Sequence, residues 1–579
     1  MVAGTSRVPV EEFVDRVERE LLALTTEAQQ MSWVYCTFIT EDTETLAAKA
    51  EARAIRTTVQ FAKEAVPLAT QAVDAVNARR LKLLRLSLSL ATPADPAEAE
   101  ELTRLVAAMT GTYSRGRYQP KGKDHPLDVQ ALDHILEESQ DLVELTDVWE
   151  GWHRASRPLR TSYPRYVELA NRGSRELGFA DTGEMWRSKY DMPPRTFANE
   201  ADRLWLQVRP LYRSLHAFVR QRLHRQYGAN VVPAEGPIPA QLLGNMWAQN
   251  WAGLFPRLVP RATEASPDIG RALKSRGTTP VEIVRIAERF FVSLGFAPLP
   301  ETFWTRSMFT RPRDREVVCH ASAWDVDSVD DLRLKMCIDV SAEDFKTIHH
   351  ELGHNFYQRA YAGQSFLFRD GAHDGFHEAI GDTITLSITP EYLQEIGLLD
   401  PRPADETQLG PLLHHALETV AFLPFGLLID RWRWEVFSGQ VDPREYNARW
   451  WALRHEYQGV SPPVERTEAD FDPGAKFHVP ANVPYMRYFL AGILQFQFHR
   501  ALVRVAGRSG PIHSCSIYGN ADAGERLRTM LAMGCSREWP EALEVITGER
   551  RMDAAAILEY FAPLKAWLDE QNRGAPVGW

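Results

Sequence analysis

The sequence predicts a mainly α protein that carries one small β-hairpin. In residues 10–90 and 200–227, apolar side chains recur at steps of three and four, which is the spacing of a helix that buries one face. Only two short runs, 316–324 and 332–340, show the alternation that is typical of strands. We therefore expect helices packed around one small sheet.

The helical stretches follow one another with few interruptions. Residues 10–90 predict two or three long helices, and 129–170 continue the pattern after a basic loop that contains glycine and proline. A long helix is expected at 200–227, with a kink or a break at Pro210 because proline removes a backbone donor. The aromatic-rich stretch 242–251 is also expected to be helical.

The two strand-like runs predict a hairpin. An acidic loop, 325–331, separates 316–324 from 332–340. Folding the two runs onto each other brings Cys319 toward Cys337, so a disulfide between them is geometrically plausible. The second run leads directly into the next element, a helix that carries several histidines.

That helix contains the H-E-x-x-H pattern of a zinc site. His350 and His354 are four residues apart, so on a helix both imidazoles can reach one metal ion. Glu351 lies between them, where it can act on a metal-bound water without being a ligand. His349 falls beside the apolar stripe of the helix and is excluded as a ligand. The stripe consists of Phe345, Ile348, Leu352 and Phe356.

A third ligand decides whether the pattern is a metal site or a chance match, since a catalytic zinc usually takes three protein ligands. The stretch 375–382 offers Glu378 and Asp382, again four apart. One helix can therefore present Glu378 to the metal and Asp382 to a ligand histidine. The alternative is a solvated acidic face, which the flanking Phe376 and Ile380 disfavour.

Composition restricts the class of protein. The chain has 579 residues, of which 44% are hydrophobic, and a net charge of −11, which suits a large globular protein and disfavours a nucleic-acid partner. No run of about 18 apolar residues occurs, so no membrane span is expected. The start, Met1–Thr5, lacks the parts of a signal peptide, which indicates a cytoplasmic protein or a removed leader. No Asn-x-Ser/Thr sequon occurs, which favours a bacterial product.

The stretch 474–488 gathers a lysine, a histidine, two tyrosines and an arginine. With it, the sequence resembles the angiotensin-converting enzyme (peptidyl-dipeptidase A) family of gluzincin metallopeptidases. The resemblance implies a single catalytic domain over 1–579, shaped as a large helical ellipsoid with a deep central cleft, in which N-terminal helices within 1–125 form a lid. The matching stretches run in order from about Val148 to the C-terminus and include GFADTGEMWRSKY, LLGNMWAQNW, REVVCHASAWD, HHELGH, GFHEAIGD and KFHVPANVPYMRYF.

The resemblance implies roles for the residues around the metal. His350, His354 and Glu378 would be the zinc ligands, Glu351 the general base and then acid, and Asp382 the support of a ligand histidine. Zinc is therefore the expected cofactor. Such an ion lowers the pKa of a bound water and polarises a carbonyl.

Further residues are implied to hold a peptide. By resemblance, His320 and His478 hold the carbonyl beyond the scissile bond, and Tyr488 is the donor in the transition state. Ala323 would pair with the peptide backbone. Three side chains would hold the free carboxylate of the substrate: Gln249, Lys476 and Tyr485. Taken alone, such residues are more often a surface lysine, a satisfied histidine or a core tyrosine.

The family's two chloride sites correspond to Arg187, Trp450 and Arg454 for one ion, and to Tyr227 with Arg487 for the other. All five residues are present, so chloride is expected as a possible activator. The alternative is that these arginines only form ion pairs, as arginines in helical proteins usually do.

The sequence also departs from the family pattern. Gly492 replaces a phenylalanine and Thr419 a lysine in the second prime pocket, so a roomier pocket is expected. Of the family's disulfides, the one between Cys319 and Cys337 is carried over. Cys515 lacks its usual partner, and it is either free or paired with another cysteine, Cys535.

The leading hypothesis is a zinc-dependent peptidyl-dipeptidase that releases C-terminal dipeptides from oligopeptides with a free carboxylate. A monocarboxypeptidase, as in one branch of the family, would need an arginine near the position of Gln249, and the glutamine argues against it. A silent peptide-binding homologue is disfavoured because every ligand and donor is present. The family is usually exported, so a secreted or periplasmic location is expected, with a cytoplasmic one as the alternative.

Overall fold

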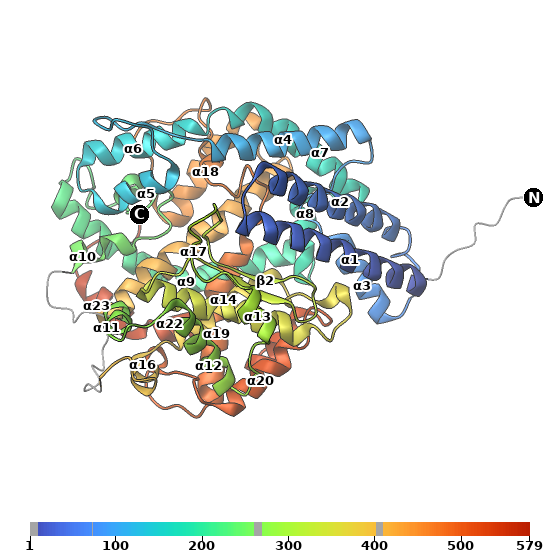
Figure 1. Ribbon diagram of the computed structural model, residues 1–579. Helices are drawn as coiled ribbons and strands as arrows, with labels where there is room; N and C mark the ends of the chain where they lie inside the picture. The colour runs from blue at the N-terminus through green and yellow to red at the C-terminus, as the bar shows by residue number, and fades with distance from the viewer. Residues whose placement is uncertain (1–9, 72, 260–268, 401–408) are drawn as a thin grey trace, which may run out of the picture.

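Helices dominate the computed structural model, which describes residues 10–71, 73–259, 269–400 and 409–579 (Figure 1). The prediction of a mainly α protein is confirmed; the segment Met1–Thr5 lies outside the described residues. The helices, in chain order, are α1 (Val10–Thr37), α2 (Glu41–Ala65), α3 (Ala75–Leu86), α4 (Pro96–Ser114), α5 (Val129–Glu138), α6 (Leu142–Ala155), α7 (Leu159–Glu176), α8 (Thr182–Arg187), α9 (Pro194–Tyr227), α10 (Phe255–Leu258), α11 (Ile269–Ser275), α12 (Pro280–Ser293), α13 (Glu301–Arg306), α14 (Ala342–Tyr361), α15 (Asp374–Leu386), α16 (Pro390–Glu395), α17 (Leu409–Phe437), α18 (Tyr446–Leu453), α19 (Met486–Val505), α20 (Ala521–Leu531), α21 (Trp539–Thr547), α22 (Ala555–Tyr560) and α23 (Ala562–Gln571).

The expected hairpin is present and is shorter than predicted. Strands β2 (Ser322–Asp325) and β3 (Leu332–Lys335) pair antiparallel, with Ala323 opposite Leu334. A second, parallel pair, β1 (Ile238–Pro239) with β4 (Val460–Ser461), was not predicted, because two residues are too short to show a period.

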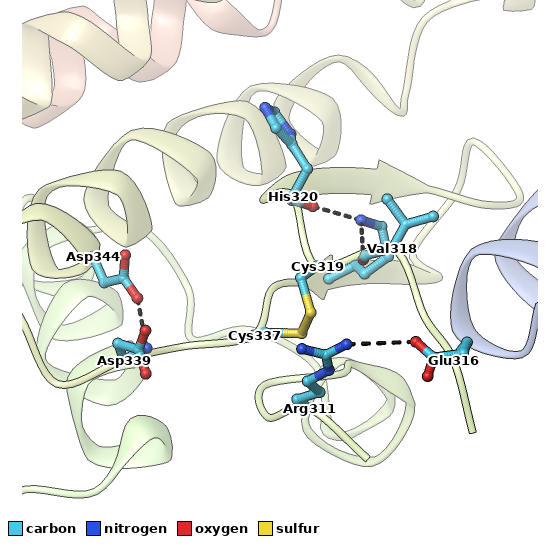
Figure 2. Close-up of a disulfide and its surroundings, with 9 residues drawn as sticks. Arg311, Glu316, Val318, Cys319, His320, Cys337, Asp339 and Asp344 are labelled. Atoms are coloured by element: carbon cyan, nitrogen blue, oxygen red, sulfur yellow. Dashed lines mark hydrogen bonds and ion pairs between the residues drawn. A yellow bond between two sulfur atoms is a disulfide. The ribbon is translucent and has the colours of Figure 1, made fainter. Parts of the chain in front are cut away.

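The hairpin is closed by the disulfide between Cys319 and Cys337, which is confirmed (Figure 2). It joins the segment before β2 to the segment after β3, and the Cys337 N–H donates to the Cys319 carbonyl at 3.3 Å. The remaining cysteines, Cys36, Cys515 and Cys535, are free, so the alternative of a bond between the last two does not hold.

The N-terminal helices α1, α2 and α3 build a small core of their own. It lies at the edge of the molecule, where α1 and α2 run side by side (Figure 1). Several contacts join it to the rest: the Glu18 carboxylate accepts from Ser365 Oγ at 2.6 Å, and the Trp33 ring meets Trp324 edge-on at 5.4 Å. Val59 and Ala62 of α2 and Leu86 of α3 also belong to the main hydrophobic core. The members of this core are Val10, Phe13, Val14, Val17, Leu21, Phe61, Ala65, Leu81 and Leu84.

Two local expectations differ from the structure. Helix α9 continues through Pro210, so the expected break is absent, and a kink there stays a prediction; the proline lies on the exposed side of the helix. The stretch 242–251 is irregular beyond its first residue, and Ala248 has a left-handed φ of 52°. Side chains replace the helix bonds there: Asn245 Oδ1 accepts from the Trp247 N–H at 3.1 Å, and Asp133 accepts from the Met246 N–H.

Helix α17 crosses the middle of the molecule (Figure 1). By length and composition, it is the one described helix that could span a membrane, with a mean hydropathy of 1.6 over its most apolar window. Of that window, 72% is buried inside the protein. Because α17 is long and apolar enough to pass this test, the expectation that the chain has no membrane span is not confirmed.

Candidate metal centre and substrate cavity

Helix α14 presents the two histidines of the motif on the face opposite its apolar stripe. The helix begins at Ser341, whose side chain accepts from the Asp344 N–H. The stripe residues Phe345, Ile348, Leu352 and Phe356 are at most 1% exposed, so burial fixes the rotation of the helix.

His349 is excluded as a ligand, as predicted. Its ring is buried, and its two nitrogens are taken by the Phe345 carbonyl at 2.7 Å and the Tyr392 hydroxyl at 2.9 Å. Burial lowers the pKa of His349 to about 4, so the ring is neutral and structural.

The structure brings together the three expected ligands, His350, His354 and Glu378. The two Nε2 atoms lie 3.1 Å apart, and Glu378 Oε2 lies 3.7 Å from His350 Nε2 and 4.0 Å from His354 Nε2. Ligand atoms at the usual zinc distance of about 2 Å from one tetrahedral centre stand roughly 3.3 Å from one another. Two nitrogens and one oxygen at these spacings fit a zinc ion, with one coordination position left for water or substrate.

Close packing of helices α14 and α15 sets these spacings. At their crossing, Gly353 faces Gly381, and a Cβ on Gly353 would lie 2.8 Å from Gly381 Cα. A Cβ on Gly381 would lie 2.6 Å from His350 Nδ1. Both positions therefore require glycine, because any side chain would push the ligand-bearing helices apart.

Each ligand histidine has a partner behind it. His350 Nδ1 lies 2.9 Å from Asp382 Oδ1, the carboxylate predicted for this role. His354 Nδ1 lies 3.1 Å from His377 Nδ1, and His377 Nε2 lies 3.2 Å from the Tyr361 hydroxyl. Sequence reasoning missed His377, although its position directly before Glu378 was a usable signal.

The charges at the site favour metal binding. Burial would raise the pKa of Glu378, but the nearby His350, His354 and Arg487 lower it to about 2, so it is an anion. Burial also raises the pKa of Glu351, more than the neighbouring His350 and the Ala323 N–H lower it. A carboxylate with a raised pKa is a stronger base near neutral pH.

A cavity of about 390 Å³ extends from the metal centre. It brings together the expected residues Gln249, His478, Tyr485 and Tyr488 with Glu378. His478 Nδ1 is buried and has no hydrogen-bond partner among the described residues, and burial with the nearby Lys476 and arginines lowers its pKa to about 2. A neutral imidazole with a free nitrogen is suited to hold an uncharged carbonyl.

The residues expected to hold the substrate carboxylate lie close to one another, and two of them, Gln249 and Tyr485, line the cavity. The Tyr485 hydroxyl donates to Gln249 Oε1 at 3.1 Å. Lys476 is 7% exposed, and its Nζ lies 3.9 Å from the centre of the Trp247 ring and 5.6 Å from that of Tyr485. Among the described residues no carboxylate lies within ion-pair distance of Lys476, so this buried ammonium lacks an anion.

His320 and Ala323 lie on the hairpin side of the metal helix and do not line the cavity. The Ala323 N–H bonds to Glu351, which ties strand β2 to the expected general base. Lys335 Nζ donates to the His320 carbonyl at 2.5 Å and to the Val318 carbonyl at 2.9 Å. In Figure 2, the His320 ring points away from the disulfide.

The residues expected to bind chloride are grouped differently in the structure. Trp450 and Arg454 lie together, 5.9 Å from guanidinium carbon to ring centre, and each carries a buried N–H without a partner among the described residues. Arg187 stacks instead on the Trp434 ring at 5.0 Å. No described contact joins it to the other two.

The pairing of Tyr227 with Arg487 is wrong. Arg487 lies near Tyr190, just before helix α9, whereas Tyr227 is the last residue of that helix. A helix of 34 residues is about 50 Å long. Sequence spacing did not reveal which tyrosine faces the arginine.

A mainly helical fold with an H-E-x-x-H helix, a glutamate from the next helix and a cavity beside them is the arrangement expected of the zinc metallopeptidase class. Comparison with known proteins agrees: the family model described as angiotensin-converting enzyme, peptidase family M2, matches residues 5–579. The chain belongs to the angiotensin-converting enzyme family.

Three relatives illustrate the likeness. The angiotensin-converting enzyme of Sus scrofa is 47% identical over 493 residues, which cover 84% of this chain and 37% of the pig protein. That of the leech Theromyzon tessulatum is 44% identical over 82% of this chain and 78% of its own. That of the fly Haematobia irritans exigua is 37% identical over 98% and 94%.

The chain spans less than half the length of the mammalian relatives it matches. All the relatives compared are animal proteins, so the comparisons give no support to the bacterial origin expected from the missing sequons.

Proposed function

We propose that the protein is a zinc-dependent peptidyl-dipeptidase that removes C-terminal dipeptides from oligopeptides. One observation carries the proposal: a single cavity is lined by the metal ligand Glu378 and also by Gln249 and Tyr485. The Lys476 ammonium lies 5.6 Å from the centre of the Tyr485 ring and has no carboxylate within ion-pair distance among the described residues. A terminal carboxylate held by these residues places an internal peptide bond at the metal centre.

The chemistry would be shared between the metal and this chain's own side chains. A zinc ion held by His350, His354 and Glu378 supplies Lewis acidity, which polarises a carbonyl and makes a water more acidic. Glu351, whose pKa is raised by burial, takes the proton of the attacking water and later delivers it to the leaving amine. Its bond to the Ala323 N–H holds the carboxylate in place for both transfers.

Two further side chains would act on the reacting carbonyls. Burial raises the pKa of Tyr488, so its hydroxyl keeps the proton and can donate to the oxygen that gains charge. His478 offers a neutral imidazole to the next carbonyl of the peptide, and His320 is proposed to act with it from the hairpin side. Ala323 is proposed to pair with the backbone of the bound peptide, as a strand edge allows.

The carboxylate seat would decide the length of the product. Lys476 supplies charge, and Tyr485 and Gln249 supply directed hydrogen bonds. Because Gln249 leaves the far end open where an arginine would shorten it, release of two residues is favoured over release of one. Thr419 and Gly492 line the same cavity, so large C-terminal side chains are expected to fit.

The test is to incubate a defined peptide, with a free or an amidated C-terminus, and to read the products by mass spectrometry with and without a chelator. Sequential loss of dipeptides, abolished by the chelator and much weaker for the amide, is expected. Release of single residues would favour the monocarboxypeptidase, and zinc binding without turnover would favour a silent binding protein.

Other features of the proposal rest on fewer observations. Residues 1–579 are proposed to form one catalytic domain, and the small additional core of α1–α3 supports a role of the N-terminal helices within 1–125 as a lid. The unpaired N–H groups of Trp450 and Arg454 support a chloride there as an activator. The disulfide supports a secreted or periplasmic location, because such bonds persist in oxidising compartments.

A further inference from the structure

The environment of His354 differs from that of the other ligand histidine. His354 Nε2 faces His350 Nε2 and Glu378, so Nε2 is the nitrogen available to the metal. The proton of its neutral ring must then sit on Nδ1, which has to donate a hydrogen bond. The atom placed to accept it is His377 Nδ1, at 3.1 Å.

This requirement fixes the tautomer of His377 as well. If His377 Nδ1 accepts, the proton of its ring sits on Nε2 and must find an acceptor. The Tyr361 hydroxyl lies 3.2 Å from Nε2, on the last turn of the same helix α14 that carries His354. His354 Nδ1–H therefore donates to His377 Nδ1, and His377 Nε2–H donates to the Tyr361 hydroxyl. In the reverse direction the proton of His354 would sit on Nε2, which could then not bind the metal.

Packing holds the His377 ring in the plane that this arrangement needs. The ring stacks on Tyr357, with centroids 4.4 Å apart and an interplanar angle of 29°. The Tyr357 hydroxyl is itself held by the Ala372 N–H at 3.2 Å. On the other side, a Cβ on Gly371 would lie 3.2 Å from His377 Cδ2, so the loop before α15 closes tightly over the ring.

We propose that His377, held by Tyr361, is a positioning residue that fixes the tautomer and the orientation of His354 as a zinc ligand. The two ligand histidines are then supported by different chemistry, a carboxylate behind His350 and a neutral imidazole behind His354. A neutral partner adds no further negative charge beside Glu378, Asp382 and Glu351. Partners of this kind typically change metal affinity by about 10–100-fold.

The test measures zinc release from the loaded protein to a chromophoric chelator, so it does not depend on the proposed peptidase activity. His377→Leu removes the acceptor, and release at least tenfold faster than in the wild type is expected. His377→Asn returns an acceptor oxygen near the position of Nδ1, so most of the loss should be recovered. Tyr361→Phe removes only the acceptor behind His377, and a smaller acceleration of several-fold is expected.

A matched control contacts the same helix from α16. His349 is a buried histidine that is not a metal ligand, and its Nε2 contacts the Tyr392 hydroxyl. Tyr392→Phe therefore removes a histidine–tyrosine hydrogen bond like that between His377 and Tyr361, but away from the metal ligands. Its zinc release should equal that of the wild type. In the cobalt-loaded protein, the visible spectrum should change for His377→Leu and remain unchanged for Tyr392→Phe.

The proposal is overturned if His377→Leu and Tyr361→Phe release zinc no faster than Tyr392→Phe. It is also overturned if His377→Asn is as fast as His377→Leu, because the role would then be packing. Should His377→Leu fail to fold, the comparison of Tyr361→Phe with Tyr392→Phe decides the question alone.

Discussion

Because the Lys476 ammonium is buried, the preference of the protein for peptides with a free C-terminal carboxylate over their amides should depend on pH. Burial lowers its pKa from 10.5 to about 7, and the nearby Asp133 offsets only part of this shift. A lysine with a lowered pKa is charged below that value and loses its charge as the pH rises through it. The substrate carboxylate needs the charged form, so the preference should be nearly complete at pH 6 and should fall as the pH rises through about 7.

The size of the effect follows from this value. A drop of this size corresponds to a cost of about 5 kcal/mol for the buried charge, at ~1.4 kcal/mol per pKa unit. With a pKa of about 7, roughly nine-tenths of Lys476 is charged at pH 6 and roughly one-tenth at pH 8. The kcat/KM for a free-acid peptide, divided by that for its amide, should therefore fall about tenfold between pH 6 and pH 8.

The ratio is the useful measurement because every other titration in the active site affects both peptides. Lys476→Arg keeps the charge at all these pH values, so its ratio should be independent of pH. Lys476→Met should lose most of the preference throughout. A wild-type ratio that stays flat from pH 6 to pH 8, or a Lys476→Met variant that still prefers the free acid, would refute the assignment.

Three further predictions concern chemistry, packing and stability. Metal analysis should show that the Glu351→Gln variant binds zinc like the wild type, while its kcat falls about 10²–10⁴-fold. Undiminished turnover would exclude Glu351 as the general base. Gly381→Ala would place a Cβ 2.6 Å from His350 Nδ1 and should weaken zinc binding at least ~10-fold in chelator titrations. Gly363→Ala, with no atom within 4 Å of its new Cβ, should not weaken it. Cys319→Ser removes a disulfide between residues 18 apart in the chain and should lower the free energy of unfolding by about 3 kcal/mol in denaturant titrations. A decrease smaller than the one caused by reducing the disulfide of the wild type would argue against this stabilising role.

The metal centre was largely predictable because its geometry is local. His350 and His354 follow from helical periodicity alone, and Glu378 with Asp382 from the same spacing in the next helix. The order of the fold, long helices interrupted by one hairpin, was predictable for the same reason.

Contacts between distant segments were not predictable. The tyrosine beside Arg487 comes from before helix α9, and only the three-dimensional path of that helix excludes Tyr227. The partner of His354 also depends on how α14 and α15 cross, so the position of His377 directly before Glu378 could suggest this contact but not establish it. In 242–251, the Asn245 and Asp133 side chains accept bonds from backbone N–H groups and override the helical pattern. Asp133 lies 113 residues before its partner Met246, so the sequence around 242–251 does not reveal that bond.

The close approach of Gly353 and Gly381 gathers the metal ligands and their immediate supports into one pair of helices, between His350 and Asp382. The rest of the cavity wall comes from elsewhere, including α17, α19 and the loop around Gln249. Helix α19 also contacts the metal unit, because Gln495 Nε2 donates to Asp382 Oδ2 at 3.4 Å. Substitutions in α17 or around Gln249 can therefore alter which peptides are accepted with less effect on the metal unit than substitutions in α19.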